Sequence, residues 1–306
     1  TRLAGSDYPM DTKFLTLSRY WKGTSVRLSP EAPVPVVHVA NIENRLGGAA
    51  NVALNLARLG AKVALCGLVG TDQEANIIRK MLAEANIEDR LVVGTSSFVT
   101  IQKIRVISQN QQIVRADFEM EADTETIERV TQVATDLIKC SDTVIFSDYK
   151  KGALDRVDEL IATARENNAL TLIDPKGSSY VSYTGATVIT PNKAELAAVM
   201  GSWKSEAELI QKAETLRSTL ALDKLLLTRS EEGMTLFENG GHTHFPTEAL
   251  EVFDVSGAGD TAIATLALML TEGKDWQTAV QIANRAAGIV VSRFGTTAVT
   301  AKDLGL

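Results

Sequence analysis

From about residue 47 onward, the chain alternates short apolar runs with stretches of helical period. The apolar runs predict strands at 62–69, 142–147, 169–173, 186–190 and 223–228. The helical stretches lie at 50–59, 71–85, 155–167, 192–200, 205–220, 258–272 and 276–292. Thr71 and Glu74 read as a capping box at the start of the second helix. Strands that are apolar throughout are buried on both faces, so this alternation predicts an α/β fold with a parallel sheet covered by helices on both sides.

Length and composition are consistent with one domain over residues 1–306, because the sequence shows neither a repeat nor a low-complexity linker. The net charge of −7 argues against a nucleic acid or a membrane surface as partner, and 45% hydrophobic residues argue against disorder. The sequence shows neither a membrane-spanning apolar run nor a leader pattern, which predicts a cytoplasmic protein. Cys66 and Cys140 are expected to be buried thiols in a reducing compartment.

Two segments interrupt the alternation of strands and helices. Residues 26–46 and 98–118 alternate apolar and polar side chains in the manner of half-exposed strands. Together they predict a small sheet beside the main domain, which would be a lid over a binding site. The alternative is that they are extra edge strands with no role in binding.

The segment 254–261, DVSGAGDT, runs directly into an apolar helix. Gly257, Ala258 and Gly259 allow close approach of a ligand to the backbone, and amides at a helix N-terminus favour an anion. Asp260 follows in the first turn, where a carboxylate could take a proton from a hydroxyl that attacks phosphorus. The alternative is a glycine-rich turn in which Asp260 is only a helix cap.

Four motifs together resemble the ribokinase/PfkB carbohydrate kinase family. They are GAGD at 257–260, GGAAN at 47–51, TPNKAE at 190–195, and TRSEEG at 228–233 with Ser230 where the family has glycine. Longer segments such as SQNQQIVRADFE and SDYKKGAL are similar to the branch of this family that acts on a heptose 7-phosphate, and the resemblance covers about residues 19–306. It implies a ribokinase-like fold, with a mostly parallel sheet, helices on both faces and a small β lid. The HxGH motif of the adenylyltransferase often fused to such kinases does not occur, so no adenylyltransferase domain is expected.

The resemblance implies ATP-dependent phosphorylation of D-glycero-D-manno-heptose 7-phosphate at its anomeric hydroxyl, giving the 1,7-bisphosphate. This is a step toward the nucleotide-heptose of lipopolysaccharide cores. The implied cofactors are ATP and Mg²⁺, with a monovalent cation as a further candidate. Two alternatives stay open: a ribokinase-like kinase for another sugar or sugar phosphate, and a weakly active binding protein that keeps the fold.

For the phosphoryl transfer itself, the resemblance makes Asp260 the general base on the sugar hydroxyl. The amides of residues 257–260 would hold the γ-phosphate. Asn192 and Glu195, three residues apart on one helix face, would hold Mg²⁺ through water. The alternative for this pair is an Asn helix cap with an exposed Glu.

The nucleotide side is assigned in the same way. Lys176 follows a strand end and could reach either the ATP phosphates or the acceptor. Thr228, Ser230 and Gly233 would contact the nucleotide, and Asn284 would lie near the adenine. The alternative for Lys176 and Asn284 is an ordinary solvated or capping role.

A sugar phosphate is a dianion that needs cationic partners, and arginine suits phosphate recognition. The candidate acceptor-binding residues are Gly47, Gly48, Asn51, Lys103, Arg105, Gln109, Asn110, Arg115, Asp148 and Lys151. The cationic members of the second insert could also be solvated residues of an amphipathic hairpin. Exposed lid strands favour pairing, so a homodimer through the lid is expected, with no nucleic-acid or membrane partner.

The N-terminus departs from the family pattern. The family opens with a strand ending in G-D-x-M-L-D-R-Y-W, but here Phe14 and Ser18 stand at the two Asp positions before Arg19. Residues 1–18 are therefore not predicted to form the family's first strand. Loss of the first carboxylate predicts weak sugar binding, unless Asp7 or Asp11 takes its place through a shifted strand.

Overall fold

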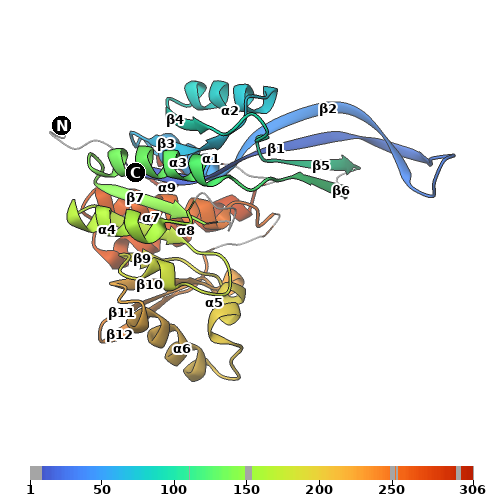
Figure 1. The fold of residues 1–306 in the computed structure, drawn as a ribbon. Helices are drawn as coiled ribbons and strands as arrows, with labels where there is room; N and C mark the ends of the chain where they lie inside the picture. The colour runs from blue at the N-terminus through green and yellow to red at the C-terminus, as the bar shows by residue number, and fades with distance from the viewer. Residues whose placement is uncertain are drawn as a thin grey trace.

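A computed structural model describes residues 9–109, 111–148, 154–248, 252, 254–293 and 298–305. Its sheet has the strand order β12-β11-β10-β9-β8-β7-β1-β3-β4, from which β2, β5 and β6 branch at β1 (Figure 1). The parallel strands are β3 (Ala64–Val69), β4 (Glu88–Val93), β7 (Thr143–Ser147), β8 (Leu170–Asp174), β9 (Val188–Ile189) and β10 (Lys224–Thr228). The antiparallel edge is made by β11 (Met234–Glu238) and β12 (Gly241–Phe245). The mostly parallel α/β architecture confirms the predicted fold class.

Helices cover both faces of this sheet because successive strand residues point to opposite sides. One core cluster contains Ile145 and Leu172 of the strands and lies under α1 (Ala49–Arg58), α2 (Gln73–Glu84), α7 (Ala258–Thr271) and α8 (Trp276–Val291). The other contains Val144 and Phe146 and lies under α3 (Thr124–Ile138), α4 (Val157–Glu166), α5 (Lys193–Met200) and α6 (Glu206–Thr219). Within the described residues, no helix combines the length and apolarity needed to cross a bilayer.

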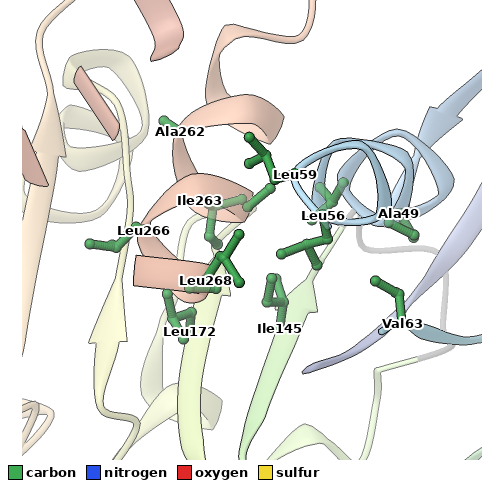
Figure 2. Packing of buried hydrophobic residues seen from close by; sticks show 14 of the residues in the cluster. Ala49, Leu56, Leu59, Val63, Ile145, Leu172, Ala262, Ile263, Leu266 and Leu268 are labelled. Carbon is green, nitrogen blue, oxygen red and sulfur yellow. The ribbon is translucent and has the colours of Figure 1, made fainter. Parts of the chain in front are cut away.

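Figure 2 shows the first of these layers from close by, where Leu56 of α1 and its C-cap residue Leu59 lie beside Ile263 and Leu268 of α7. Both helices rest on strand residues of the same cluster, so their relative position is set by close packing. This packing is what places the N-terminal ends of α1 and α7 next to each other. The short α9 (Ala301–Leu304) packs on α8 near the end of the described chain.

The strand β1 (Pro9–Leu28) connects the main sheet with the lid, because it belongs to both. Residues 10–14 of this strand pair with β3 and residues 9–12 pair with β7, both in parallel. The rest of β1 pairs with β2 (Pro35–Gly48) on one side and with β5 (Gln102–Ser108) on the other, and β5 pairs with β6 (Gln111–Phe118). Figure 1 shows these four strands extending away from the helical body. The lid therefore starts within β1 and reaches residue 48, beyond both bounds expected for the first insert.

The prediction that residues 1–18 do not form the first strand is wrong for residues 9–18, which lie in β1; residues 1–8 lie outside the described part. The segment lacks the uniform apolar character of the other central strands, and its place is fixed by backbone pairing with two distant strands. The sequence pattern did not predict β4, α3 or the β11–β12 hairpin.

Two smaller expectations also need correction. The N-cap of α2 is Asp72 rather than Thr71, and its carboxylate accepts hydrogen bonds from the backbone N–H of Ala75 and from Thr100. Burial opposes ionisation of Asp72, but the hydrogen bonds from Thr100 and Ala75 outweigh burial and lower its pKa. Cys66 is buried as expected, whereas Cys140 is exposed because it follows the C-terminal end of α3 at the surface.

Candidate active site

The two sequence motifs at the starts of α1 and α7 meet in the structure. Asn51 is buried in the first turn of α1, and its Nδ2 donates a hydrogen bond to Oδ2 of Asp260 at 2.8 Å. Asp260 lies in the first turn of α7, 209 residues away in the sequence. The amide therefore fixes one carboxylate oxygen of the predicted base.

A second asparagine, which the sequence analysis did not single out, ties the two helices together one turn further on. Asn55 donates from Nδ2 to the backbone oxygen of Asn51 at 2.8 Å. Its Oδ1 accepts from Thr261 Oγ1 at 3.1 Å and from the backbone N–H of Val299 at 3.4 Å. The only available signal was an Asn four residues after Asn51 on the apolar face of a predicted helix.

The backbone at the start of α7 suits an anion. Gly257 is the N-cap in the left-handed region, with φ of +84°, where a side chain would be strained. A Cβ added at Gly259 would meet no atom within 4 Å, so the surface there is open. The amide of Gly259 belongs to the first turn, which has no intrahelical acceptor. The Ala258 N–H, in contrast, makes a 3.3 Å contact with the Val255 oxygen, so this amide is partly engaged in the turn.

A cavity of about 360 Å³ opens directly against this helix start. It collects most of the predicted nucleotide residues, namely Asn192, Thr228, Ser230, Gly233 and Asn284. Its other walls are largely apolar and come from α7, α8 and the chain before α7, through Val252, Val255, Ala258, Ala262, Ala287 and Val291. Asn284 is buried, and its Nδ2 donates to the backbone oxygen of Pro246 at 2.7 Å. An apolar slot with a few fixed polar groups and an anion site at one end suits a nucleotide.

The loop between β10 and β11 forms one wall of the cavity and is held from outside by Arg229. This side chain is 8% exposed, and its guanidinium donates to Glu206 of α6 at 2.5 and 2.9 Å and to Glu232 at 2.8 Å. Lys193 of α5 also bonds Glu232, at 2.7 Å. The hydrogen bond from Arg229 lowers the pKa of Glu206. Within this loop, Ser230 adopts a φ of +54°, a left-handed conformation that favours glycine, the residue that the family resemblance implies at this position.

Arg229→Lys should raise the KM for ATP about tenfold, because lysine cannot reproduce the forked contacts that fix the loop. The KM for the acceptor should stay the same. The matched control is Arg217→Lys, since Arg217 is also buried and bonded to a Glu on α6 but does not line the cavity. Steady-state kinetics with ATP varied would check this, and equal effects of the two variants would contradict a role specific to the loop.

Asn192 and Glu195 form a reciprocal capping box at the start of α5. The Glu195 N–H donates to Asn192 Oδ1 at 2.9 Å, and the Asn192 N–H donates to Glu195 Oε2 at 2.8 Å. The other Glu195 oxygen pairs with Lys176 Nζ. The capping alternative therefore describes the local geometry, and Lys176 is drawn toward Glu195 rather than lining the cavity. Each of these oxygens keeps a further lone pair that could accept from a metal-bound water.

Asp148 follows β7 and is 5% exposed. The hydroxyl of Tyr183 donates to its Oδ2 at 2.6 Å, and burial followed by the charge of Asp148 raises the pKa of Tyr183. Asp148 therefore makes a buried hydrogen bond with Tyr183 directly after the end of β7. Lys151, expected beside it, and Asn110 of the lid lie outside the described residues.

The remaining acceptor candidates lie at the base of the lid and along it. Gly47 and Gly48 end β2, and a Cβ at Gly47 would meet Ser18 Oγ at 2.9 Å, so the two strands approach closely there. Gln109 is exposed just after β5, near the tip of the hairpin. Lys103, Arg105 and Arg115 share one face of the lid, because the strand register aligns them with Ser18 and Tyr20.

The chain is similar in sequence to known carbohydrate kinases. A model of the pfkB family of carbohydrate kinases matches residues 16–303. A D-beta-D-heptose 7-phosphate kinase of Bordetella bronchiseptica is 49% identical over 94% of this chain and 92% of its own. The bifunctional protein HldE of Nitrosococcus oceani is 48% identical over 94% of this chain, which spans only 61% of that relative.

Solved structures agree on the fold. Phosphofructokinase-2 from Escherichia coli in complex with potassium superposes with a TM-score of 0.82 at 16% identity, over 98% of this chain and 97% of that one. The ribokinase of Arabidopsis thaliana complexed with ribose and ATP superposes with a TM-score of 0.78 at 16% identity, with the same coverage. At this level of identity the likeness concerns the fold.

Proposed function

The chain belongs to the pfkB family of carbohydrate kinases, and from that premise we propose that it transfers the γ-phosphoryl group of ATP to the anomeric hydroxyl of a heptose 7-phosphate. The observation that carries the proposal is the Asn51–Asp260 contact in the first turn of α7, the turn whose Ala258 and Gly259 line the apolar cavity. The substrate follows from the relatives that are nearly half identical over 94% of the chain.

Phosphoryl transfer requires the protein mainly to position the two substrates and to stabilise the charge of the transferring group. The anomeric oxygen forms a bond to the γ-phosphorus while its proton passes to Asp260, and the bond from that phosphorus to the bridging oxygen of ADP breaks. Asn51 holds the Asp260 carboxylate by a hydrogen bond to Oδ2 and so restrains its orientation in the first turn of α7. Amides in the first turn of α7, including that of Gly259, stabilise the charge on the transferring group.

Mg²⁺ would neutralise the charge of the ATP phosphates when bound. Asn192 and Glu195 supply amide and carboxylate oxygens, the ligand type that Mg²⁺ prefers, and Asn192 lines the cavity. Because their nearest oxygens already serve the capping box, we assign them to hydrating waters of the ion rather than to direct ligation. A monovalent cation is a further candidate, and one fold neighbour was solved with potassium. The cytoplasm is the compartment in which ATP would be supplied to this reaction.

Release of ADP, measured over a panel of sugars and sugar phosphates, tests this function. We expect heptose 7-phosphate to give the highest kcat/KM, and ³¹P NMR should show a new phosphate ester at the anomeric position. A higher kcat/KM for another sugar phosphate would support the alternative of a different carbohydrate kinase. The absence of turnover with every acceptor, despite ATP binding, would support a binding protein that keeps the fold.

We further propose a homodimer through the lid. The lid face opposite the basic side chains carries Ile42, Val114 and Phe118, which are 51%, 52% and 47% exposed. These positions share one face through the pairing of β1 with β2 and β5 and of β5 with β6. Exposed apolar surface of this kind is typical of an interaction site, and a second copy would cover it.

Val114→Glu should convert the dimer to a monomer, because it places a charge within the apolar face. Size-exclusion chromatography with light scattering would measure this. Val181→Glu is the matched control, since Val181 is 72% exposed but lies away from the lid. A wild-type chain that is monomeric at all concentrations, or a dimer unaffected by Val114→Glu, would contradict the proposed interface.

A further inference from the structure

The cationic side chains of the lid are not equivalent. Lys103 Nζ lies 3.2 Å from both Asp117 and Glu119, and Arg115 Nε lies 2.9 Å from Asp117. These two side chains, which lie on neighbouring strands, are therefore neutralised within the lid. Their carboxylates would have to be displaced before either could grip an external anion.

Arg105 lies between them in the same register but differs in its partners. Among the described residues, no carboxylate or carbonyl oxygen is bonded to its guanidinium, and its Nη1 is enclosed without a hydrogen-bond acceptor. A half-buried cation without a counter-charge costs free energy in the isolated protein. An anionic ligand that arrives at this face would remove that cost.

Tyr20 gives this guanidinium a fixed platform. The ring is 5% exposed, and the centre of the Arg105 guanidinium lies 5.3 Å from the ring centroid. Arg45 approaches the same ring from β2, on the opposite side of β1, with a distance of 4.8 Å. Stacking of arginine on an aromatic face restrains its orientation and favours bidentate recognition of phosphate.

Among the described residues, the cations around Tyr20 differ in their charge partners. The basic face is made by Lys22, Arg45, Lys103, Arg105 and Arg115. Glu43 pairs with Lys22 and Arg45, Asp117 pairs with Lys103 and Arg115, and Glu119 pairs with Lys103, whereas no described carboxylate is bonded to Arg105. A phosphate monoester carries close to two negative charges at neutral pH, so it would supply the counter-charge that Arg105 lacks.

We propose that Arg105 anchors the phosphate monoester of the acceptor sugar, with Tyr20 as its positioning residue, while Lys103 and Arg115 serve ion pairs within the lid. The inference rests on the proposed function and deepens it, because it assigns the preference for a phosphorylated acceptor to one side chain. The sequence alone treated the three cations alike. In the structure, Lys103 and Arg115 form ion pairs within the lid, whereas Arg105 stacks on Tyr20.

The test compares heptose 7-phosphate with unphosphorylated heptose as acceptors. Arg105→Gln should raise the KM for heptose 7-phosphate by about tenfold to a hundredfold, as expected for loss of a charge-assisted contact, without changing the KM for ATP. It should leave the KM for heptose unchanged, so that discrimination between the two acceptors is lost. Arg115→Gln should raise the KM for heptose 7-phosphate less than about threefold, and Arg27→Gln, at an exposed β1 cation, should have no effect.

Tyr20 is tested by a pair of substitutions. Tyr20→Phe keeps the ring and should behave as the wild type, whereas Tyr20→Leu should raise the KM for heptose 7-phosphate and leave kcat intact. An equal loss with Arg115→Gln, or an Arg105→Gln variant that weakens both acceptors alike, would overturn the proposal.

A second measurement separates this inference from the proposed function. Calorimetric titration with inorganic phosphate needs no turnover, and we expect weak binding to the wild-type chain that disappears in Arg105→Gln and persists in Arg115→Gln. If no heptose phosphate is turned over but this pattern holds, the anchor stands and the substrate assignment fails. If phosphate binds the Arg105→Gln variant as well as the wild type, the anchor assignment is wrong even for an active kinase.

Discussion

Asp260→Asn should lower kcat by about 10²-fold or more, the usual loss when a general base is removed. Asparagine has nearly the same shape, so it can keep the contact with Asn51 and leave the first turn of α7 in place. What it lacks is the ability to take the proton of the attacking hydroxyl. ATP binding should therefore remain nearly unchanged, as followed by nucleotide titration, while ADP release falls.

The control for this substitution is Asp275→Asn. Asp275 caps the N-terminus of α8 and accepts from the Thr278 N–H at 3.0 Å, so it tests the general effect of removing a carboxylate at a helix start. We expect a small loss of thermal stability there and no change in kcat. Wild-type turnover in Asp260→Asn would show that this carboxylate is only a helix cap.

Phe14→Asp should lower the KM for the sugar phosphate by about 100-fold. The family resemblance implies Asp at this position, and a carboxylate that accepts from two sugar hydroxyls contributes about 3 kcal/mol. The backbone of residue 14 forms the last parallel pair of β1 with β3, opposite Leu68. It therefore lies at the carboxyl end of a central strand, where α/β proteins bind ligands. The side chain of Phe14 itself is outside the described residues.

The register also separates this prediction from its alternative. Asp11 pairs with Leu65 and Ile145, three residues before the end of the parallel region, so its backbone lies about 10 Å further into the sheet. Asp11→Asn should then leave the KM for the sugar unchanged; Asp7 is outside the described residues and needs its own Asn variant. Our interpretation of the N-terminal segment would be wrong if the wild-type chain already binds the sugar phosphate tightly and neither Phe14→Asp nor the two Asn variants alters that binding.

The sequence determined much of the fold because its signals are local. The helices α1, α5, α6, α7 and α8 begin and end within two residues of the predicted bounds, since apolar period and capping residues act over one or two turns. Because Asn192 and Glu195 are three residues apart, the sequence also predicted their capping box, as the alternative to magnesium binding. Fold class followed from the alternation of elements, because fully apolar strands need helices on both faces.

Only the tertiary structure decided which distant residues meet. The contact of Asn51 with Asp260 depends on how α1 packs against α7, and the place of residues 9–18 depends on pairing with β3 and β7. Lys103, Arg105 and Arg115 look alike in the sequence, yet strand register gives two of them carboxylate partners and stacks the third on Tyr20. Long-range pairing is fixed by the whole set of buried contacts rather than by neighbours in the chain, and therefore the sequence pattern predicted the elements but not the geometry of the site.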